Sequence, residues 1–183
     1  MNKQDLHERL DKVDLRLVHW LARYSLTFLR IGMGIVFLWF GALKFFPELS
    51  PATGLAVRTI DMLTFGMIPE NISLILLAAL ESAIGLGFLT GKYLRLTLGL
   101  LVFQMVGALT PLALFPGEAF TFFPYAPTLE GQYIIKNLVL IGAGLVIGST
   151  IRGGKIVAEP YESYWQSTQM TAPHAWREET RPK

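Results

Sequence analysis

Four long apolar stretches, separated by short polar or helix-breaking segments, dominate the sequence. They cover residues 25–46, 72–89, 94–115 and 134–151. A helix needs about 20 mostly apolar residues to cross the roughly 30 Å hydrocarbon layer of a bilayer. The pattern therefore predicts an all-α fold, a polytopic four-helix bundle that is integral to a membrane and surrounded by lipid.

Basic residues indicate how these helices face. They gather before the first span, at Lys92 and Arg95 between the second and third spans, and at Arg152 and Lys155 after the fourth. Residues 116–132 contain neither Lys nor Arg. Basic residues in short flanking segments resist translocation, so we expect both termini to lie in the cytoplasm.

The segments outside the 25–151 membrane domain differ in pattern. Residues 1–24 carry apolar positions spaced 4-3-4-3-4, which are Leu6, Leu10, Val13, Leu17, Trp20 and Tyr24. This spacing predicts an amphipathic helix, which either lies on the cytoplasmic membrane surface or docks a partner or a second copy. Residues 152–183 lack periodicity and predict a mostly disordered cytoplasmic tail. Ser50 and Pro51 are typical of a helix start and predict a short helix to about Leu63.

Composition excludes several classes of function. The chain is 52% hydrophobic and only 16% charged, and its net charge of +2 is too small for a nucleic-acid-binding protein. It has no cysteine, which excludes disulfides, thiolate metal sites and iron–sulfur ligation. None of its three histidines lies in an apolar stretch, which excludes a haem held between two histidines inside the bilayer. We expect no metal and no intrinsic cofactor.

Glu81 lies near the middle of the second span, where an ionisable side chain costs at least ~2.5 kcal/mol. Such a carboxyl group is either protonated or paired with a cation. In a structural role it pairs with Arg30 or accepts a hydrogen bond from Gln104, which lies at a similar depth. In a functional role it binds a proton or a ligand. The sequence leaves both roles open.

Three cations lie within the spans, near their ends. Arg30 either reaches the cytoplasmic interface or bends the other way to pair with Glu81, and we favour the pairing. Lys44 and Lys136 each suit an interfacial anchor in the outer leaflet, and Lys44 could also pair with Glu48 four residues later. Together they could instead line a pocket for an anionic or quinone-like headgroup, with Trp39, Tyr125, Tyr133 and Asn137.

Small residues predict where the helices approach closely. They recur along the first, second and fourth spans, at Gly34, Gly41, Ala79, Ala83, Gly87, Gly91, Gly144 and Gly148. No segment matches a phosphate-binding loop, a nucleophile with a histidine base or a paired-carboxylate site. We therefore expect no catalysis by this chain alone and assign no catalytic residue.

Three segments resemble the DoxX family of small bacterial membrane proteins. The first is Arg30 with Gly34 and residues 37–45, FLWFGALKF. The second is residues 81–87, ESAIGLG, followed by Leu89, Thr90 and Gly91. The third is residues 130–137, EGQYIIKN, which is the most specific.

The resemblance implies a four-helix bundle in the bacterial cytoplasmic (inner) membrane and a link to redox or oxidative-stress physiology. The family includes a membrane subunit of an archaeal thiosulfate:quinone oxidoreductase. It therefore implies a cofactor-free membrane subunit of a quinone-linked complex, with a soluble redox protein or a second copy as partner. The alternatives are a small proton-coupled transporter and a purely structural membrane scaffold.

Overall fold

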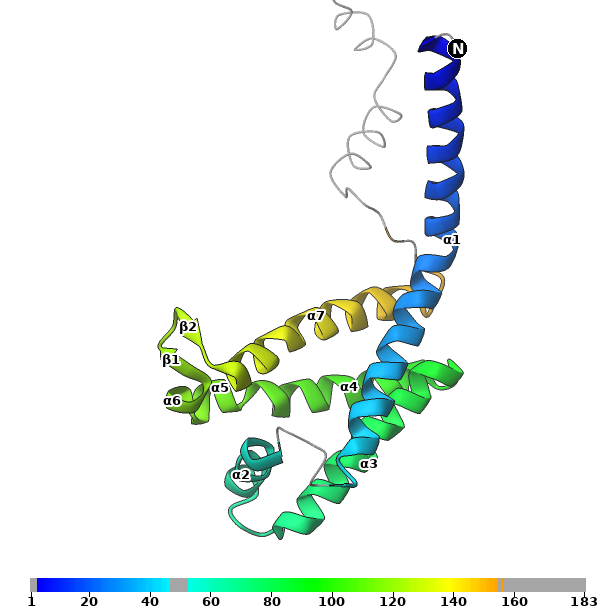
Figure 1. Cartoon of the computed structure of the whole chain (residues 1–183). Helices are drawn as coiled ribbons and strands as arrows, with labels where there is room; N and C mark the ends of the chain where they lie inside the picture. The colour runs from blue at the N-terminus through cyan, green and yellow to red at the C-terminus, as the bar shows by residue number, and fades with distance from the viewer. Residues whose placement is uncertain (1–2, 47–52, 155, 157–183) are drawn as a thin grey trace, which may run out of the picture.

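The computed structural model describes residues 3–46, 53–154 and 156. Its elements are α1 (Lys3–Leu43), α2 (Thr53–Leu63), α3 (Glu70–Thr90), α4 (Leu94–Leu109), α5 (Pro111–Leu114), α6 (Pro116–Ala119), β1 (Phe120–Phe122), β2 (Ala126–Pro127) and α7 (Leu129–Thr150) (Figure 1). Four stretches of this described chain are long and apolar enough to cross a membrane. The prediction of an all-α, four-span fold is confirmed.

The long helices pack side by side in the order α1, α3, α4, α7, and the α1–α3 contact is the most extensive. Helices α1 and α3 are antiparallel, since Gly34 faces Leu89 and Gly41 faces Ser82. This register places the end of α1, at Leu43, level with the middle of α3. Short α2 packs against the first half of α3.

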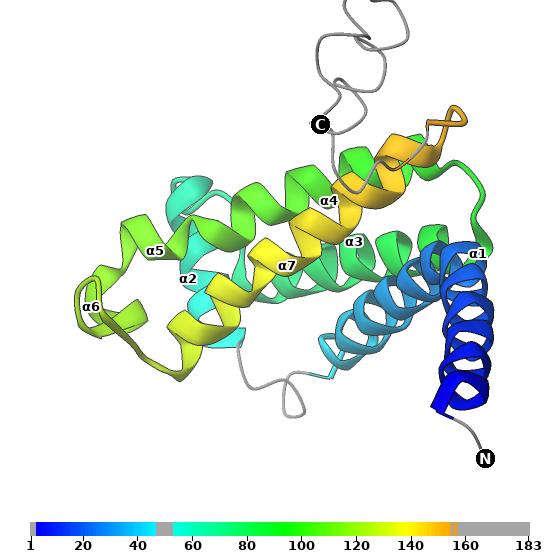
Figure 2. The ribbon, with the colours of Figure 1, turned by 90° about the horizontal axis from the view of Figure 1, so that it is seen from above.

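Helix α1 is longer than the first predicted span. It runs unbroken for 41 residues and joins the amphipathic segment to the membrane-spanning segment without a gap. Figure 2 shows that the N-terminal half points in a different direction from the half that packs in the bundle. A continuous hydrogen-bonded helix explains why no turn signal separates the two segments near Tyr24. The predicted helix start at Ser50 and Pro51 and the predicted disordered tail, apart from its first few residues, lie outside the described residues.

Two span boundaries also differ from the prediction. The third span is broken after Leu109, and α5 starts at Pro111. Proline has no backbone N–H and its ring clashes with the preceding turn, so it interrupts the helix. Helix α7 begins at Leu129, five residues before the predicted start at 134, because the Thr128 side chain caps its first turn by accepting from the Gly131 N–H.

The connection between α4 and α7 contains a two-stranded antiparallel ribbon, β1–β2, that the sequence did not predict. The hydroxyl group of Thr128 donates to the Glu118 carbonyl at 2.6 Å and ties the ribbon to α6. A side chain at Gly131 would overlap the Ala119 carbonyl group. The glycine of the EGQY segment therefore permits this tight packing of α7 on α6.

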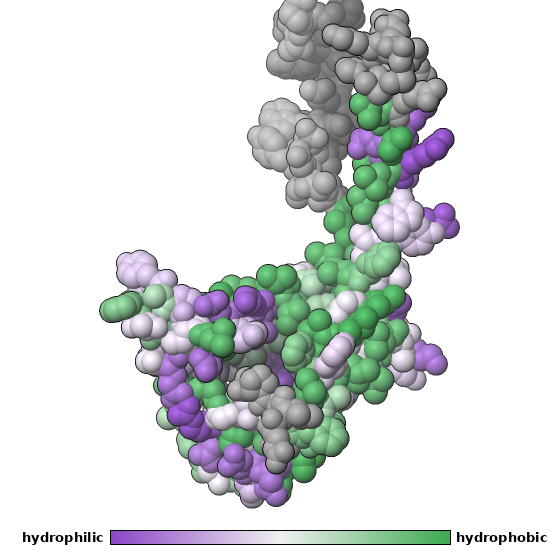
Figure 3. Space-filling view, in the orientation of Figure 1, coloured by the Kyte–Doolittle hydropathy of each residue, from purple (hydrophilic) through white to green (hydrophobic). Residues whose placement is uncertain are grey.

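Hydropathy differs along the molecule. Figure 3 shows mainly hydrophobic side chains over the middle of the bundle and hydrophilic ones at the end that carries α2 and α6. Large apolar side chains such as Phe103, Val139 and Leu145 are exposed on α4 and α7. A multi-pass membrane protein needs such lipid-facing surfaces.

Candidate functional site

A buried polar cluster joins three of the long apolar segments. The Lys44 ammonium group, just after α1, donates to Glu81 Oε2 at 2.6 Å. From α4, Gln104 Nε2 donates to Glu81 Oε1 at 2.9 Å. The Lys44 and Glu81 side chains are only 14% and 10% exposed. We refer to Lys44, Glu81 and Gln104 as the Glu81 cluster.

Two glycines bring the members of this cluster together. A side chain at Gly85 would overlap the Leu38 backbone, and one at Gly41 would contact Ser82 and Glu81. The absence of side chains at these positions lets α1 and α3 approach closely. Because α1 ends beside the middle of α3, Lys44 emerges at the depth of Glu81.

The cluster satisfies its charges and keeps hydrogen-bonding capacity. The ammonium group has three N–H donors and the Gln104 amide has two, and one of each bonds to Glu81. Next to Glu81, the Ser82 hydroxyl group is buried and has no hydrogen-bond partner among the described residues. Such an arrangement can hold a proton on the carboxylate and donate hydrogen bonds to a carbonyl or an anion.

The predicted hydrogen bond from Gln104 to Glu81 is present, but the favoured pairing of Glu81 with Arg30 is wrong. The Arg30 guanidinium group occupies the space beside Gly91, where any side chain would overlap it. Gly91 ends α3 with a φ of 68°, a left-handed conformation that glycine adopts easily. A cation is favourable at a helix C-terminus, so Arg30 lies at the α3 end and Lys44 takes its place at Glu81.

The structure separates the two lysines of the predicted headgroup pocket. Lys136 is exposed, and its ammonium group lies 5.2 Å from the centroid of the Tyr133 ring. Trp39 and Tyr125 are also exposed. The described residues therefore do not form this pocket. Glu48, the alternative partner of Lys44, lies outside the described residues.

The predicted packing glycines are mostly in contact. Gly34 faces Leu89, Gly87 faces Thr97, and Gly144 and Gly148 face leucines of α4. The contact predicted along the second span, however, was only partly right. Ala79 and Ala83 are exposed, so the side of α3 that packs on α1 is the neighbouring one. The prediction missed Gly85, although its spacing of four from Glu81 could have indicated that both face α1.

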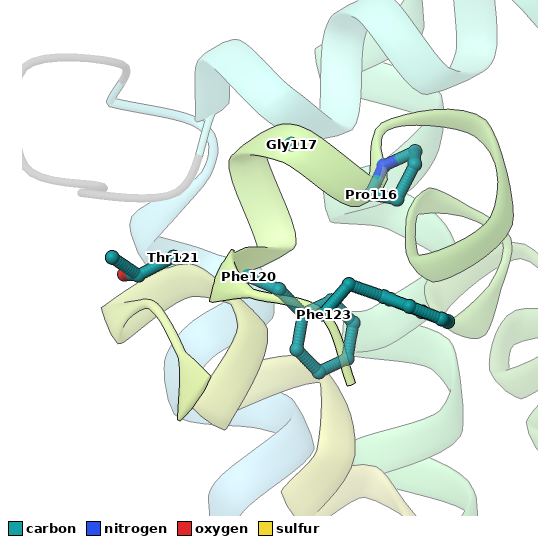
Figure 4. A pocket seen from close by; sticks show the side chains of 5 residues that line it. All are labelled: Pro116, Gly117, Phe120, Thr121 and Phe123. Atoms are coloured by element: carbon teal, nitrogen blue, oxygen red, sulfur yellow. The ribbon is translucent and has the colours of Figure 1, made fainter. Parts of the chain in front are cut away.

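Two further features lie outside the cluster. Arg58 on α2 makes two hydrogen bonds to the Glu118 carboxylate on α6, one of them at 2.8 Å, and lies 5.4 Å from the Phe115 ring centroid. A pocket of about 490 Å³ opens beside α6 and β1 (Figure 4). Its lining residues are Pro116, Gly117, Phe120, Thr121 and Phe123. None of these is ionisable, so the pocket adds no acid–base group.

Comparison with known proteins supports the resemblance noted from the sequence. A family model described as DoxX matches residues 25–115. The match includes the bundle half of α1, all of α3 and α4, and every member of the Glu81 cluster. No curated protein and no solved structure matches the chain. Among the described residues, no group of three His, Cys, Asp or Glu side chains could hold a metal ion.

Proposed function

This chain belongs to the DoxX family of integral membrane proteins, and we propose that it is a membrane subunit of a quinone-linked redox complex. In this proposal the Glu81 cluster is the polar site at which a quinone headgroup binds within the bundle. The observation that supports it is a lysine–glutamate pair buried at mid-span and bonded to Gln104. Intramembrane ionisable residues are expensive, and they commonly mark ligand or proton sites.

The donors of the cluster fit a quinone headgroup. Quinone carbonyl groups accept hydrogen bonds, and Lys44 and Gln104 keep N–H groups beyond those given to Glu81. The unpartnered Ser82 hydroxyl group adds a third donor nearby. A bound quinone would supply two-electron redox chemistry, in which each reduction takes up two protons.

The residues of the chain would bind and orient the headgroup and hold a proton at Glu81. The sequence contains no cysteine, so the proposal assigns thiol or iron–sulfur electron carriers to a soluble partner protein. The bilayer-facing surface of the bundle would give a lipid-soluble quinone direct entry from the membrane. The family resemblance supports this choice over a role in packing alone.

The test is a mild-detergent purification of the full chain from its native membranes, followed by mass spectrometry and extraction of bound quinone. We expect a stoichiometric oxidoreductase partner and bound quinone in the wild type. Lys44→Met should lose the quinone and keep the partner. Lys136→Met is the matched control, since it removes an exposed lysine, and should keep both.

A protein that purifies without partner or quinone would contradict the proposal. Reconstitution of the chain alone in liposomes would then test the transporter alternative, for which the buried Glu81 carboxylate is the relevant observation. Proton-coupled uptake that is abolished by Glu81→Gln would establish transport. If Glu81→Gln changed only stability, the cluster would be structural.

A further inference from the structure

The buried apolar residues are distributed unevenly about the Glu81 cluster. One contiguous core consists of Met33, Phe37, Ile84, Phe88, Leu101, Met105 and Ile147. On α3 its members follow Glu81, and on α1 they precede Lys44. All of them except Met105, which is level with Gln104, therefore lie between the cluster and the α3–α4 turn. Tightly packed apolar side chains exclude water from that half of the bundle.

The other half of the bundle is built differently. Helix α1 ends at Leu43, and short α2 packs against α3. The buried apolar residues on this side, Val57, Leu74, Ala78, Ala119 and Ile134, do not belong to the contiguous core. Residue 78, next to the cluster, is only an alanine. Among the described residues, this half therefore has no contiguous core like the one that closes the half towards the α3–α4 turn.

The two halves also differ in the hydrogen bonding of two buried hydroxyl residues at equivalent helix positions. Ser73 lies in the first turn of α3 and Thr97 in the first turn of α4, and they are 1% and 4% exposed. The Thr97 hydroxyl group donates to the Tyr93 carbonyl. The Ser73 hydroxyl group is buried and has no partner among the described residues. An unpaired buried hydroxyl group usually bonds to an ordered water molecule.

We propose that water at Ser73 connects the Glu81 cluster to one end of the bundle only, the end that carries α2 and the β1–β2 ribbon (Figure 1). Ser73 lies eight residues before Glu81, and both are buried; they are separated by a rise of about 12 Å and a rotation of about 80° about the helix axis, a distance that a short chain of waters spans. The core closes the opposite route. Under the proposed function this path supplies protons for quinone reduction, but its existence is independent of any redox activity.

Cysteine labelling in the full chain tests this path, because the wild-type sequence has no cysteine and gives no background. Ala78→Cys and Ile84→Cys form a matched pair, since both side chains are 0% exposed and lie three residues from Glu81 on opposite sides. The proteins would be placed in nanodiscs, where both membrane faces meet solvent. A charged methanethiosulfonate reagent would then report access through water.

We expect residue 78 to react at least ~10-fold faster than residue 84, because labelling requires a hydrated path to the thiol. Ser73→Cys should likewise react faster than Thr97→Cys. This second pair replaces the first if Ala78→Cys or Ile84→Cys fails to fold. Complete labelling of each variant in denaturant confirms that its thiol is intact. Equal rates, or faster reaction at 84 and 97, would overturn the proposal. Because the labelling reaction does not require quinone, this result is separate from that of the purification experiment.

Discussion

At the scale of single residues, the ion pair between Lys44 and Glu81 is sensitive to the loss of either partner because both side chains are largely buried. A buried pair contributes little net stability, but the loss of one partner leaves an uncompensated charge. We therefore expect Lys44→Met to lower the free energy of unfolding by about 3–5 kcal/mol. The measurement is denaturant or thermal unfolding of the purified protein in a mild detergent.

The double variant Lys44→Met/Glu81→Gln distinguishes this effect from lost packing. It removes both charges while the glutamine can still bond to Gln104, so we expect much of the stability to return. Lys136→Met, which removes an exposed lysine, should change stability by no more than about 0.5 kcal/mol. A double variant as unstable as the sum of its two single variants would show that charge compensation is not the cause.

The residue-level prediction from the sequence was right about Glu81 and Gln104 and wrong about Arg30. Mid-span charge and matching depth can be read from residue order alone, which is why the first two were found. The partner cation depends on where α1 ends relative to α3, and Gly41 and Gly85 set that register through backbone contact. Residue order does not contain this three-dimensional relation.

At the scale of elements, the α1–α3 contact depends on Gly85, which lies against the Leu38 backbone. A methyl group at this position must push the two helices apart. We expect Gly85→Ala to destabilise the protein by about 1–3 kcal/mol, as overpacking does. The same detergent unfolding experiment measures the change.

Gly32→Ala is the matched control, because a side chain there meets no atom within 4 Å. It lies within α1, the helix that packs against α3, and alanine favours helix more than glycine, so the change should be neutral or slightly stabilising. Equal losses in both variants would show that the effect does not arise from the contact of α1 with α3.

Arg58 and Glu118 join α2 to α6 by a two-pronged but exposed ion pair. Exposed pairs usually contribute less than about 1 kcal/mol, so Glu118→Ala should barely change global unfolding. Its effect should be local, as faster amide hydrogen exchange in α2. The charge swap Arg58→Glu/Glu118→Arg should restore slow exchange, and unchanged exchange in Glu118→Ala would show that apolar packing alone holds α2.

The sequence predicted the helices whose existence depends on hydropathy alone, and it missed the features that depend on other effects. The four spans follow from apolar length. The unbroken α1 was missed because the pattern of apolar residues changes near Tyr24 while the backbone stays helical. The break at Pro111 follows from the proline ring, and the β1–β2 ribbon is too short to produce a strand pattern. Helix and strand boundaries therefore required the three-dimensional structure.

At the scale of the whole molecule, the two ends of the bundle differ in charge as well as in packing. The α3–α4 turn carries Lys92 and Arg95, whereas residues 116–132 of the α4–α7 connection carry no basic residue. Basic turns remain in the cytoplasm during insertion. This rule predicts that the packed core lies in the cytoplasmic half of the bundle and that the proposed hydrated path at Ser73 lies in the opposite half.

Tyr93 and Tyr125 give a matched pair for testing this orientation. They lie in the α3–α4 turn and in the β1–β2 connection, and they are 83% and 87% exposed. With Cys at these positions, a membrane-impermeant maleimide added to intact cells or spheroplasts should label Tyr125→Cys. Tyr93→Cys should react only after the membrane is permeabilised, because the basic turn lies inside. The reverse labelling would show that the molecule has the opposite orientation and that the proposed path from the Glu81 cluster leads to the cytoplasm. Labelling of both sites in intact cells would contradict the single span that separates them.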